Sequence, residues 1–215
     1  MIASILKYRR QVTAFTLLEL IMVMAIVGIL AVFVVPAFNS INRASSLTNS
    51  AALVVDQLTR ARQEALSQNR IVEVRFYKLP GEVGTSPAYR AFRIYIYDES
   101  VQFASPLTAV LKLSPGMIIL EDRSFSTLLN ADSNKRALDP VTDIIPGQRD
   151  PVTYQAFRFR PSGGTDLDPN GAPGPDKWFF SVKSETDPPA GTYPAHNYIT
   201  ATIDPVSGRI RIFRP

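Results

Sequence analysis

Few side chains in this sequence could carry out chemistry. His196 is the only histidine, and there are no cysteines. Because His196 lies in a proline-flanked segment and has no thiol to activate, we interpret it as a solvated loop residue and not as the base of a Ser-His-Asp triad. The glycine spacings of a P-loop or a dinucleotide site and the ligand spacing of a zinc site do not occur. The sequence therefore predicts a protein that is not an enzyme and uses no cofactor.

One acidic loop begins in the way a calcium loop does. Asp166, Asp168 and Asn170 place oxygen atoms at alternate positions, and Gly171 follows them. Calcium prefers about six to eight oxygen ligands, and a glycine at this point permits a sharp turn. The position that should supply a bidentate Glu is Lys177 instead. We therefore favour an acidic surface loop and assign no metal site, with calcium binding as the alternative.

Arginines occupy alternate positions of two predicted C-terminal strands, at Arg158, Arg160, Arg209 and Arg211. If these strands are neighbours, the guanidinium groups form a basic face that could bind DNA or another polyanion. Alternating arginines also occur on solvated strand faces, where they discourage edge-to-edge aggregation. The second interpretation is the commoner one, and nucleic acid is therefore a possible but not an expected partner.

The net charge gives little support to nucleic-acid binding. The formal net charge is +4, and three of the 23 basic residues, Lys7, Arg9 and Arg10, lie in the first 14 positions, which contain no acid. Without them, the rest of the chain has a nearly balanced charge, so only a local patch could attract a polyanion. The absence of cysteine means that packing alone must hold the domain together.

The longest apolar segment of the chain, Phe15–Phe38, contains a single charge, Glu19. Its length is about the 20 residues that a membrane-spanning helix needs. A carboxylate in hydrocarbon is costly, so Glu19 is expected to have a partner. The basic residues upstream keep that end in the cytoplasm. The sequence thus predicts a single-pass inner-membrane protein whose chain after Phe38 lies outside, in the periplasm or beyond.

The order Phe15-Thr16-Leu17-Leu18-Glu19, after a cationic leader and with Pro36 downstream, resembles the type IV prepilin and pseudopilin family. The resemblance implies that prepilin peptidase cuts between Ala14 and Phe15 and that the new Phe15 amine is methylated. It also implies assembly with other pilin or pseudopilin subunits into a filament. The family usually has Gly before the cut, and Ala14 is the smallest replacement for it.

Two other interpretations of the N-terminal region remain open. A secretory signal has a basic region, an apolar region and a small-x-small cleavage site, for which Val35-Pro36-Ala37 is the candidate. The segment could also be an uncleaved anchor. Neither alternative accounts for the order of residues from Phe15 to Glu19.

Beyond Pro36 the helical period continues, so one helix is expected from about Phe15 to about Gln68. The apolar positions recur at steps of three and four, which is the pattern of one helix face packed on a sheet. These positions are Ala44, Leu47, Ala51, Val54, Leu58, Ala61 and Ala65. Pro36 is expected to kink the helix where it leaves the membrane.

After the helix the pattern changes to a period of two, which indicates strands. Strands are expected around residues 72–77, 92–97, 107–113, 117–120, 154–160, 178–183, 198–204 and 208–213, and the last two are expected to form a hairpin. Residues 124–151 lose the period and are interpreted as an irregular surface excursion. The predicted fold class is α+β, a long N-terminal helix packed on a β-rich antiparallel head.

The predicted organisation has four parts. Residues 1–14 are a leader, 15–38 a transmembrane and filament-core helix, 39–69 an amphipathic half-helix, and 70–215 a globular head. This order resembles the minor pseudopilins of the type II secretion H kind, the fimbrial T proteins and the cassette-encoded prepilin-like proteins of Verrucomicrobia. The predicted function is that of a minor pilin or pseudopilin, with Glu19 and Pro36 serving filament assembly. The alternative is a pilin that binds DNA or another polyanion through the arginine face.

Overall fold

The structure is a computed structural model that describes residues 15–81, 86–130, 142–170, 178–188 and 197–214, apart from the side chains of residues 32–40. The chain divides into two compact units, Met1–Asn42 and Arg43–Pro215. The predicted leader and His196 lie outside the described residues. The four predicted parts of the chain are not tested by this division and stay a prediction.

One helix, α1 (Leu17–Gln68), takes up most of the first unit and begins the second. It runs through position 36 without a break, as the continuous helical period predicts. Its C-terminal end is formed by Asn69, whose φ of 49° is left-handed, and by Arg70, whose backbone N–H donates to the carbonyl oxygen of Ala65 over 3.3 Å. This geometry satisfies a carbonyl at the helix terminus and ends the helix where the sequence predicts.

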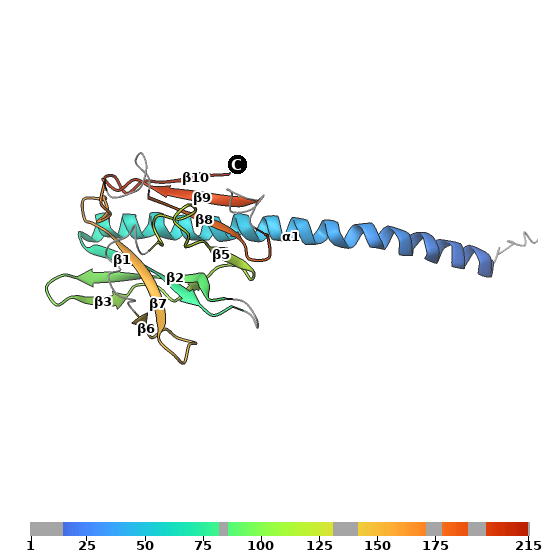
Figure 1. The fold of residues 1–215 in the computed structure, drawn as a ribbon, viewed down its shortest axis with the longest axis horizontal. Coiled ribbons are helices and arrows are strands. Elements are labelled where there is room, and N and C mark those ends of the chain that lie inside the picture. The colour runs from blue at the N-terminus through green and yellow to red at the C-terminus, as the bar shows by residue number, and fades with distance from the viewer. Residues whose placement is uncertain (1–14, 82–85, 131–141, 171–177, 189–196, 215) are drawn as a thin grey trace, which may run out of the picture. The chain divides into compact units, whose positions relative to one another are not determined.

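Within the described residues, ten strands of the second unit form one antiparallel sheet (Figure 1). They are β1 (Ile71–Leu79), β2 (Ala88–Asp98), β3 (Phe103–Pro106), β4 (Leu111–Lys112), β5 (Met117–Ile119), β6 (Thr142–Asp143), β7 (Val152–Phe159), β8 (Trp178–Ser184), β9 (Tyr198–Ile203) and β10 (Ile210–Phe213). The spatial order is β10-β9-β8-β5-β2-β1-β7-β6, and β3 and β4 also pair with β2.

The centre of the sheet is the hairpin of β1 and β2, with β7 on the other side of β1. Val74 of β1 is opposite Ile94 of β2 and opposite Phe157 of β7. The predicted hairpin of β9 and β10 is confirmed, and β1 and β2 form another antiparallel pair. Because these strands alternate apolar and polar side chains, pairing them in register gathers their apolar residues on one face of the sheet.

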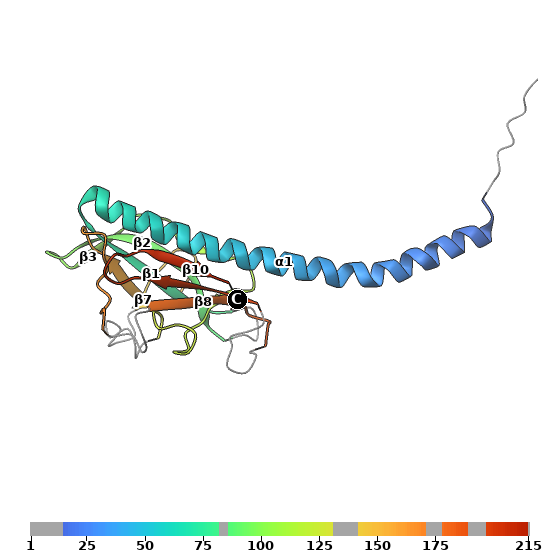
Figure 2. The ribbon, with the colours of Figure 1, turned by 90° about the horizontal axis from the view of Figure 1, so that it is seen from above.

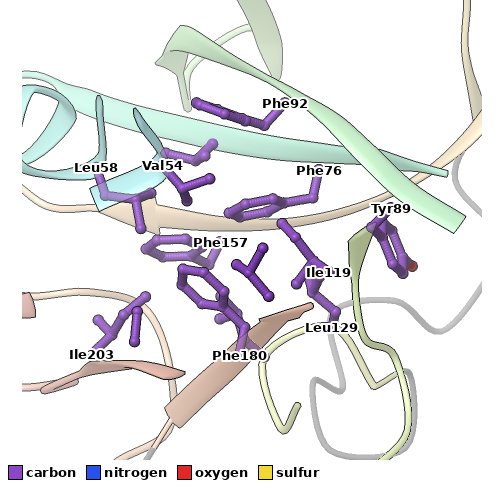
Figure 3. Close-up of a cluster of buried hydrophobic side chains, with 14 of the residues drawn as sticks. Val54, Leu58, Phe76, Tyr89, Phe92, Ile119, Leu129, Phe157, Phe180 and Ile203 are labelled. Carbon is purple, nitrogen blue, oxygen red and sulfur yellow. The ribbon is translucent and has the colours of Figure 1, made fainter. Parts of the chain in front are cut away.

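Residues 43–68 of α1 lie along that apolar face (Figure 2). Six of the seven predicted stripe positions are buried, from Leu47 to Ala65, and Leu58 is fully buried. They pack against aromatic rings of the sheet. Among these rings, the centroids of Phe76 and Phe180 lie 6.0 Å apart (Figure 3). The predicted α+β fold, a helix on a β-rich antiparallel head, is confirmed.

The opposite face of the sheet carries a second, smaller core that was not predicted from the sequence. It is formed by Tyr77, Leu79, Ala91, Tyr95, Ile145 and Val152. Ile145 is only 2% exposed although it lies in the segment interpreted as a surface excursion. The sheet is thus covered on both faces near β6.

The interpretation of residues 124–151 as a surface excursion is wrong for residues 126–129 and for Ile145, which are buried, whereas most of the other described residues of this segment are exposed or half-buried. Leu128 and Leu129 are buried in the main core, and Thr127 accepts a 2.9 Å hydrogen bond from the backbone N–H of Phe179 in β8. These contacts satisfy polar groups without a regular strand, so no period appears in the sequence. Residues 131–141 lie outside the described part. The short strands β3 and β6 were not predicted either.

Candidate functional site

The N-terminal end of α1 is closed by a reciprocal pair of hydrogen bonds between Thr16 and Glu19. The backbone N–H and the hydroxyl of Thr16 each donate to Oε2 of Glu19 over 2.9 Å, and the backbone N–H of Glu19 donates to Oγ1 of Thr16 over 3.2 Å. This is a capping box, in which a Thr and a Glu three residues later satisfy backbone donors of the first turn. Glu19 therefore has a local structural role that was not predicted from the sequence.

The large apolar side chains around this cap and along the turns after it are exposed. Phe15 is 83% exposed, and the large apolar residues from Leu17 to Leu30 are exposed by more than half. An apolar surface of this extent marks a site that contacts a membrane or another protein. In the part of the chain that the structure describes, no helix is long and apolar enough to cross a membrane.

The predicted processing and assembly residues are only partly described. Ala14 lies outside the described residues, and Phe15 begins them. Pro36 is part of α1, but its side chain is not described. Cleavage, methylation and the assembly roles of Glu19 and Pro36 thus stay predictions.

The predicted arginine face does not form as a single surface. Strands β7 and β10 are not neighbours, because β9, β8, β5, β2 and β1 lie between them in the sheet. Arg158 donates from Nε to Glu73 over 2.6 Å, and its guanidinium carbon lies 3.3 Å from the ring centroid of Tyr97. Arg158 is therefore engaged within the fold, while Arg160 and Arg209 remain exposed.

Arg158 belongs to a network of charged and tyrosine side chains on the sheet face opposite α1. The carboxylate of Glu73, which is 3% exposed, accepts from Arg158 and, over 2.6 Å, from Nε of Arg75. Arg75 also donates from Nη1 to Oδ2 of Asp143 over 3.0 Å. A buried carboxylate is tolerated only when it is paired in this way.

Two tyrosines complete the network around Asp143. The hydroxyls of Tyr77 and Tyr95 lie 2.6 Å apart, and they donate to Oδ2 of Asp143 over 2.8 Å and 3.0 Å. Burial would raise the pKa of Asp143, but the hydrogen bonds from Tyr77, Tyr95 and Arg75 outweigh it and hold the pKa below its ordinary value. Burial, followed by the bonds to Tyr95 and Asp143, raises the pKa of Tyr77 well above its usual range. The network therefore fixes β6 to the sheet through an ionised carboxylate.

This network was not predicted from the sequence, for a specific reason. Glu73, Arg75 and Tyr77 alternate with the core residues of β1, which is also the pattern of side chains that face water. The signal that could have identified them is the matching sequence of polar and aromatic residues at Arg93, Tyr95 and Tyr97 on the adjacent strand. Asp143, which accepts hydrogen bonds from Arg75, Tyr77 and Tyr95, has no feature in the sequence around it that indicates this role.

In the loop with calcium-like spacing, two carboxylate oxygens accept hydrogen bonds within the fold. Oδ1 of Asp166 accepts from the backbone N–H of Arg158, and Oδ1 of Asp168 accepts from that of Asn170, over 2.9 Å and 2.8 Å. Gly171 and Lys177 lie outside the described residues. In the described part of the chain, no three His, Cys, Asp or Glu side chains are grouped so that they could hold a metal ion.

Comparison with known proteins gives one family match. Residues 9–35 match the family described as the prokaryotic N-terminal methylation motif. No curated protein sequence matches the chain. The matched residues include Phe15, Thr16 and Glu19, so the match confirms the N-terminal motif on which the predicted resemblance depends.

Two solved structures are similar to the chain. One is the minor pseudopilin EpsH from the type 2 secretion system of Vibrio cholerae, with 11% identity, a TM-score of 0.41, and coverage of 79% of this chain and 98% of that chain. The other is the type IV minor pilin FimU of Pseudomonas aeruginosa strain PAO1, with 14% identity, a TM-score of 0.45, and coverage of 80% of this chain and 93% of that chain.

Proposed function

We propose that this chain is a minor pilin or pseudopilin, a structural subunit of a type IV pilus-like or type II secretion filament. It is anchored in the inner membrane by Phe15–Phe38 before assembly, and it carries out no reaction. The match of residues 9–35 to the methylation motif is the observation that carries this proposal. The head stays on the periplasmic or extracellular side.

The helix α1 supports the proposal through the contrast between its two parts. In the first unit the described apolar side chains of α1 are exposed, with Ile21 at 57% and Ile29 at 62%. In the second unit the same helix buries Val54 and Leu58 completely. A soluble domain would gain nothing from the exposed part, whereas a subunit that moves from a membrane into a filament core needs such a surface.

The proposal includes processing of the N-terminus. Prepilin peptidase removes the leader by cutting between Ala14 and Phe15, and the Phe15 amine is then methylated. Phe15 directly precedes Thr16, the N-cap residue of α1, so cutting there leaves the capping box intact.

Mass spectrometry of the protein extracted from membranes tests the processing step. The expected result is a mature chain that begins at methylated Phe15 and, in cells that express the filament system, is recovered with other pilin subunits. A chain that begins at Phe38 would identify a secretory signal instead. A chain that retains Met1 would identify an uncleaved anchor.

A second candidate function is binding of DNA or another polyanion by the exposed arginines of the β9–β10 hairpin. Arg209 and Arg211 line a groove of about 460 Å³ together with Asn170 and Thr202. Two adjacent guanidinium groups can contact phosphates, and such binding weakens as salt is added. Retention of the chain on immobilised DNA at low salt, lost in the double variant Arg209→Gln and Arg211→Gln, would support this function.

A further inference from the structure

Strand β10 forms one end of the sheet and offers an unpaired backbone edge. Its four residues pair with β9, with Ile210 opposite Ile203 and Phe213 opposite Thr200. Among the described residues, no strand pairs with its other edge. Backbone groups on such an edge form a template for an added strand.

The register shows which backbone groups are available. The N–H of Asp204 donates to the carbonyl oxygen of Arg209 over 2.9 Å, so residue 209 points its carbonyl group toward β9, while its N–H donates to the hydroxyl of Ser207 in the turn. In an antiparallel pair this direction alternates along the strand. Arg211 and Phe213 therefore also bond to β9, while Ile210 and Ile212 direct their N–H and C=O groups away from the sheet.

The two faces of β10 differ in chemistry. Ile210 and Ile212 lie on the same face as their partners Ile203 and Ala201, which belong to the core under α1. Ile210 packs against this core, but Ile212 is 47% exposed. The apolar layer is thus incomplete at this edge, and an apolar side chain on an added strand would extend it.

The other face of β10 carries the basic residues Arg209 and Arg211, followed by the half-exposed Phe213. Arg209 and Arg211 are exposed, and neither forms an ion pair with any residue that the structure describes. The nearest acid on this hairpin, Asp204, accepts from the backbone N–H of Val206 and, over 2.7 Å, from the hydroxyl of Ser207. The hydrogen bond from Ser207 and, to a smaller extent, the charge of Arg211 lower the pKa of Asp204, but no ion pair forms between the two side chains. Acidic side chains on an added strand would pair with these two arginines.

The charge pattern also decides which occupant fits. A second copy that paired β10 with β10 would bring two copies each of Arg209 and Arg211 close together, and like charges across strands destabilise such a pair. An extended segment with acidic residues at alternate positions has the opposite charge on the required face. Its intervening residues must be apolar, because they cover Ile212.

We infer that β10 is a docking edge for an extended segment of a partner protein in which acidic and apolar residues alternate. The segment adds as a further strand beside β10. Its apolar side chains cover Ile212, and its acidic side chains face Arg209 and Arg211. This inference does not depend on the proposed processing or filament function, since it uses only the edge, faces and charges of the second unit.

The full chain in detergent, with a synthetic peptide of alternating Glu and Val about eight residues long, tests the inference. Binding should slow hydrogen exchange at the Ile212 amide by about tenfold or more at saturation, because this N–H gains a partner. The amides of Arg211 and Phe213, which already bond to β9, should change little. Protection of the Ile212 amide in the free chain would overturn the inference, because the edge would then be occupied already.

Three peptide controls separate edge pairing from simple charge attraction. A peptide of alternating Lys and Val should not bind, because its charge is the same as that of Arg209 and Arg211. A peptide of alternating Glu and Ser should not bind, because it leaves Ile212 uncovered. A Glu and Val peptide that is N-methylated at alternate backbone positions should fail because it cannot form the ladder. Equal binding by any of the three, or no binding by the Glu and Val peptide, would contradict the inference.

Two protein variants complete the test. Ile212→Pro removes the outward N–H without removing a bond to β9, and proline is tolerated on edge strands. It should abolish peptide binding, whereas Ile212→Val should retain it. The double variant Arg209→Gln and Arg211→Gln keeps the backbone edge, so it remains informative if the proline variant does not fold. It should weaken binding by about tenfold and reduce its dependence on salt, and unchanged binding would contradict the role of the arginines.

Discussion

The carbonyl oxygen of Gly163 lies against Gly208, so close that a Cβ on residue 208 would come within 2.2 Å of it. This contact joins the turn after β7 to the turn between β9 and β10. Arg62 of α1 lies over both turns and donates from Nε to the carbonyl oxygens of Gly163 and Ser207, over 3.1 Å and 2.9 Å. Two turns that are far apart in the sequence are therefore held together under the helix.

Gly208→Ala should destabilise the head by about 3 kcal/mol or more, because it adds a backbone clash to the cost of a positive φ. Gly116→Ala is the matched control, since Gly116 has a similar φ of 74° but no atom within 4 Å of the place where the added methyl group would lie. The control should lose only about 1–2 kcal/mol. Urea unfolding followed by fluorescence of Trp178, the single and buried tryptophan, measures both losses. Equal losses would mean that the two turns do not touch in solution.

The packing of α1 on the sheet gives a second prediction. Leu58 is fully buried in the core, so Leu58→Ala should cost about 2–5 kcal/mol. Leu66, on the same helix but 44% exposed, is the control, and its change to Ala should cost less than about 1 kcal/mol. The same urea titration measures both values. A loss below about 0.5 kcal/mol for Leu58 would mean that the stripe does not pack on this head.

Local periodicity explains why so much of the fold could be predicted. Steps of three and four along α1 and steps of two along β1, β2 and β7–β10 are each visible in a short stretch of sequence. The end of α1 near Gln68 was also predicted, and Asn69, one of the few residue types that adopt a positive φ readily, does so there. These features depend on neighbours in the chain and not on distant contacts.

The missed features depend on distant partners. Asp143 bonds to Arg75 across 68 positions, and Thr127 bonds to Phe179 across 52. Arg158 looked like a solvated arginine because nothing near it in the sequence indicates Glu73, which is 85 positions away. The expected arginine face required β7 and β10 to be neighbours, and strand order cannot be determined from the pattern of any single strand.

The network around Asp143 predicts a dependence of stability on pH. The pKa of Asp143 in the fold lies below its ordinary value of 3.8, so the folded chain binds this proton less tightly than the unfolded chain does. The carboxylate therefore stabilises the fold above about pH 4, and this contribution is lost as the pH falls through the lowered pKa. Asp143→Asn should cost about 1–3 kcal/mol at pH 7, because it weakens the bonds from Arg75 and the two tyrosines.

The difference in unfolding free energy between the wild type and Asp143→Asn should shrink as the pH is lowered from 7 to about 3. Asp150→Asn is the control, because Asp150 is exposed and forms no ion pair in the described part of the chain. It should show a small difference at every pH. A difference for Asp143→Asn that is constant with pH would mean that the carboxylate is not held by these bonds.

The last prediction separates two roles of Glu19 in the proposed filament subunit. In the capping box, Oε2 of Glu19 accepts from Thr16, and within the described residues Oε1 accepts no hydrogen bond. Glu19 could thus cap its own helix and still offer a negative charge to the Phe15 amine of a neighbouring subunit, where the low dielectric strengthens the attraction. Glu19→Leu removes both the cap and the charge, whereas Glu19→Gln keeps the cap, because Gln also completes a capping box, and removes the charge alone.

If the charge serves assembly, both variants should be cleaved normally and remain in the membrane, because neither the cut nor insertion needs the carboxylate. The yield of crosslinks to their pilin partners should then be about tenfold lower than for the wild type. Each variant loses the attraction between the Glu19 carboxylate and the Phe15 amine of a neighbouring subunit, which is strong in a low-dielectric setting. Mass spectrometry checks the processing, and crosslinking yield in cells that express the filament system checks the assembly. Normal assembly of Glu19→Gln with failure of Glu19→Leu would assign the role to the cap, because only the cap distinguishes the two variants. Normal assembly of both would show that this subunit enters its filament without Glu19.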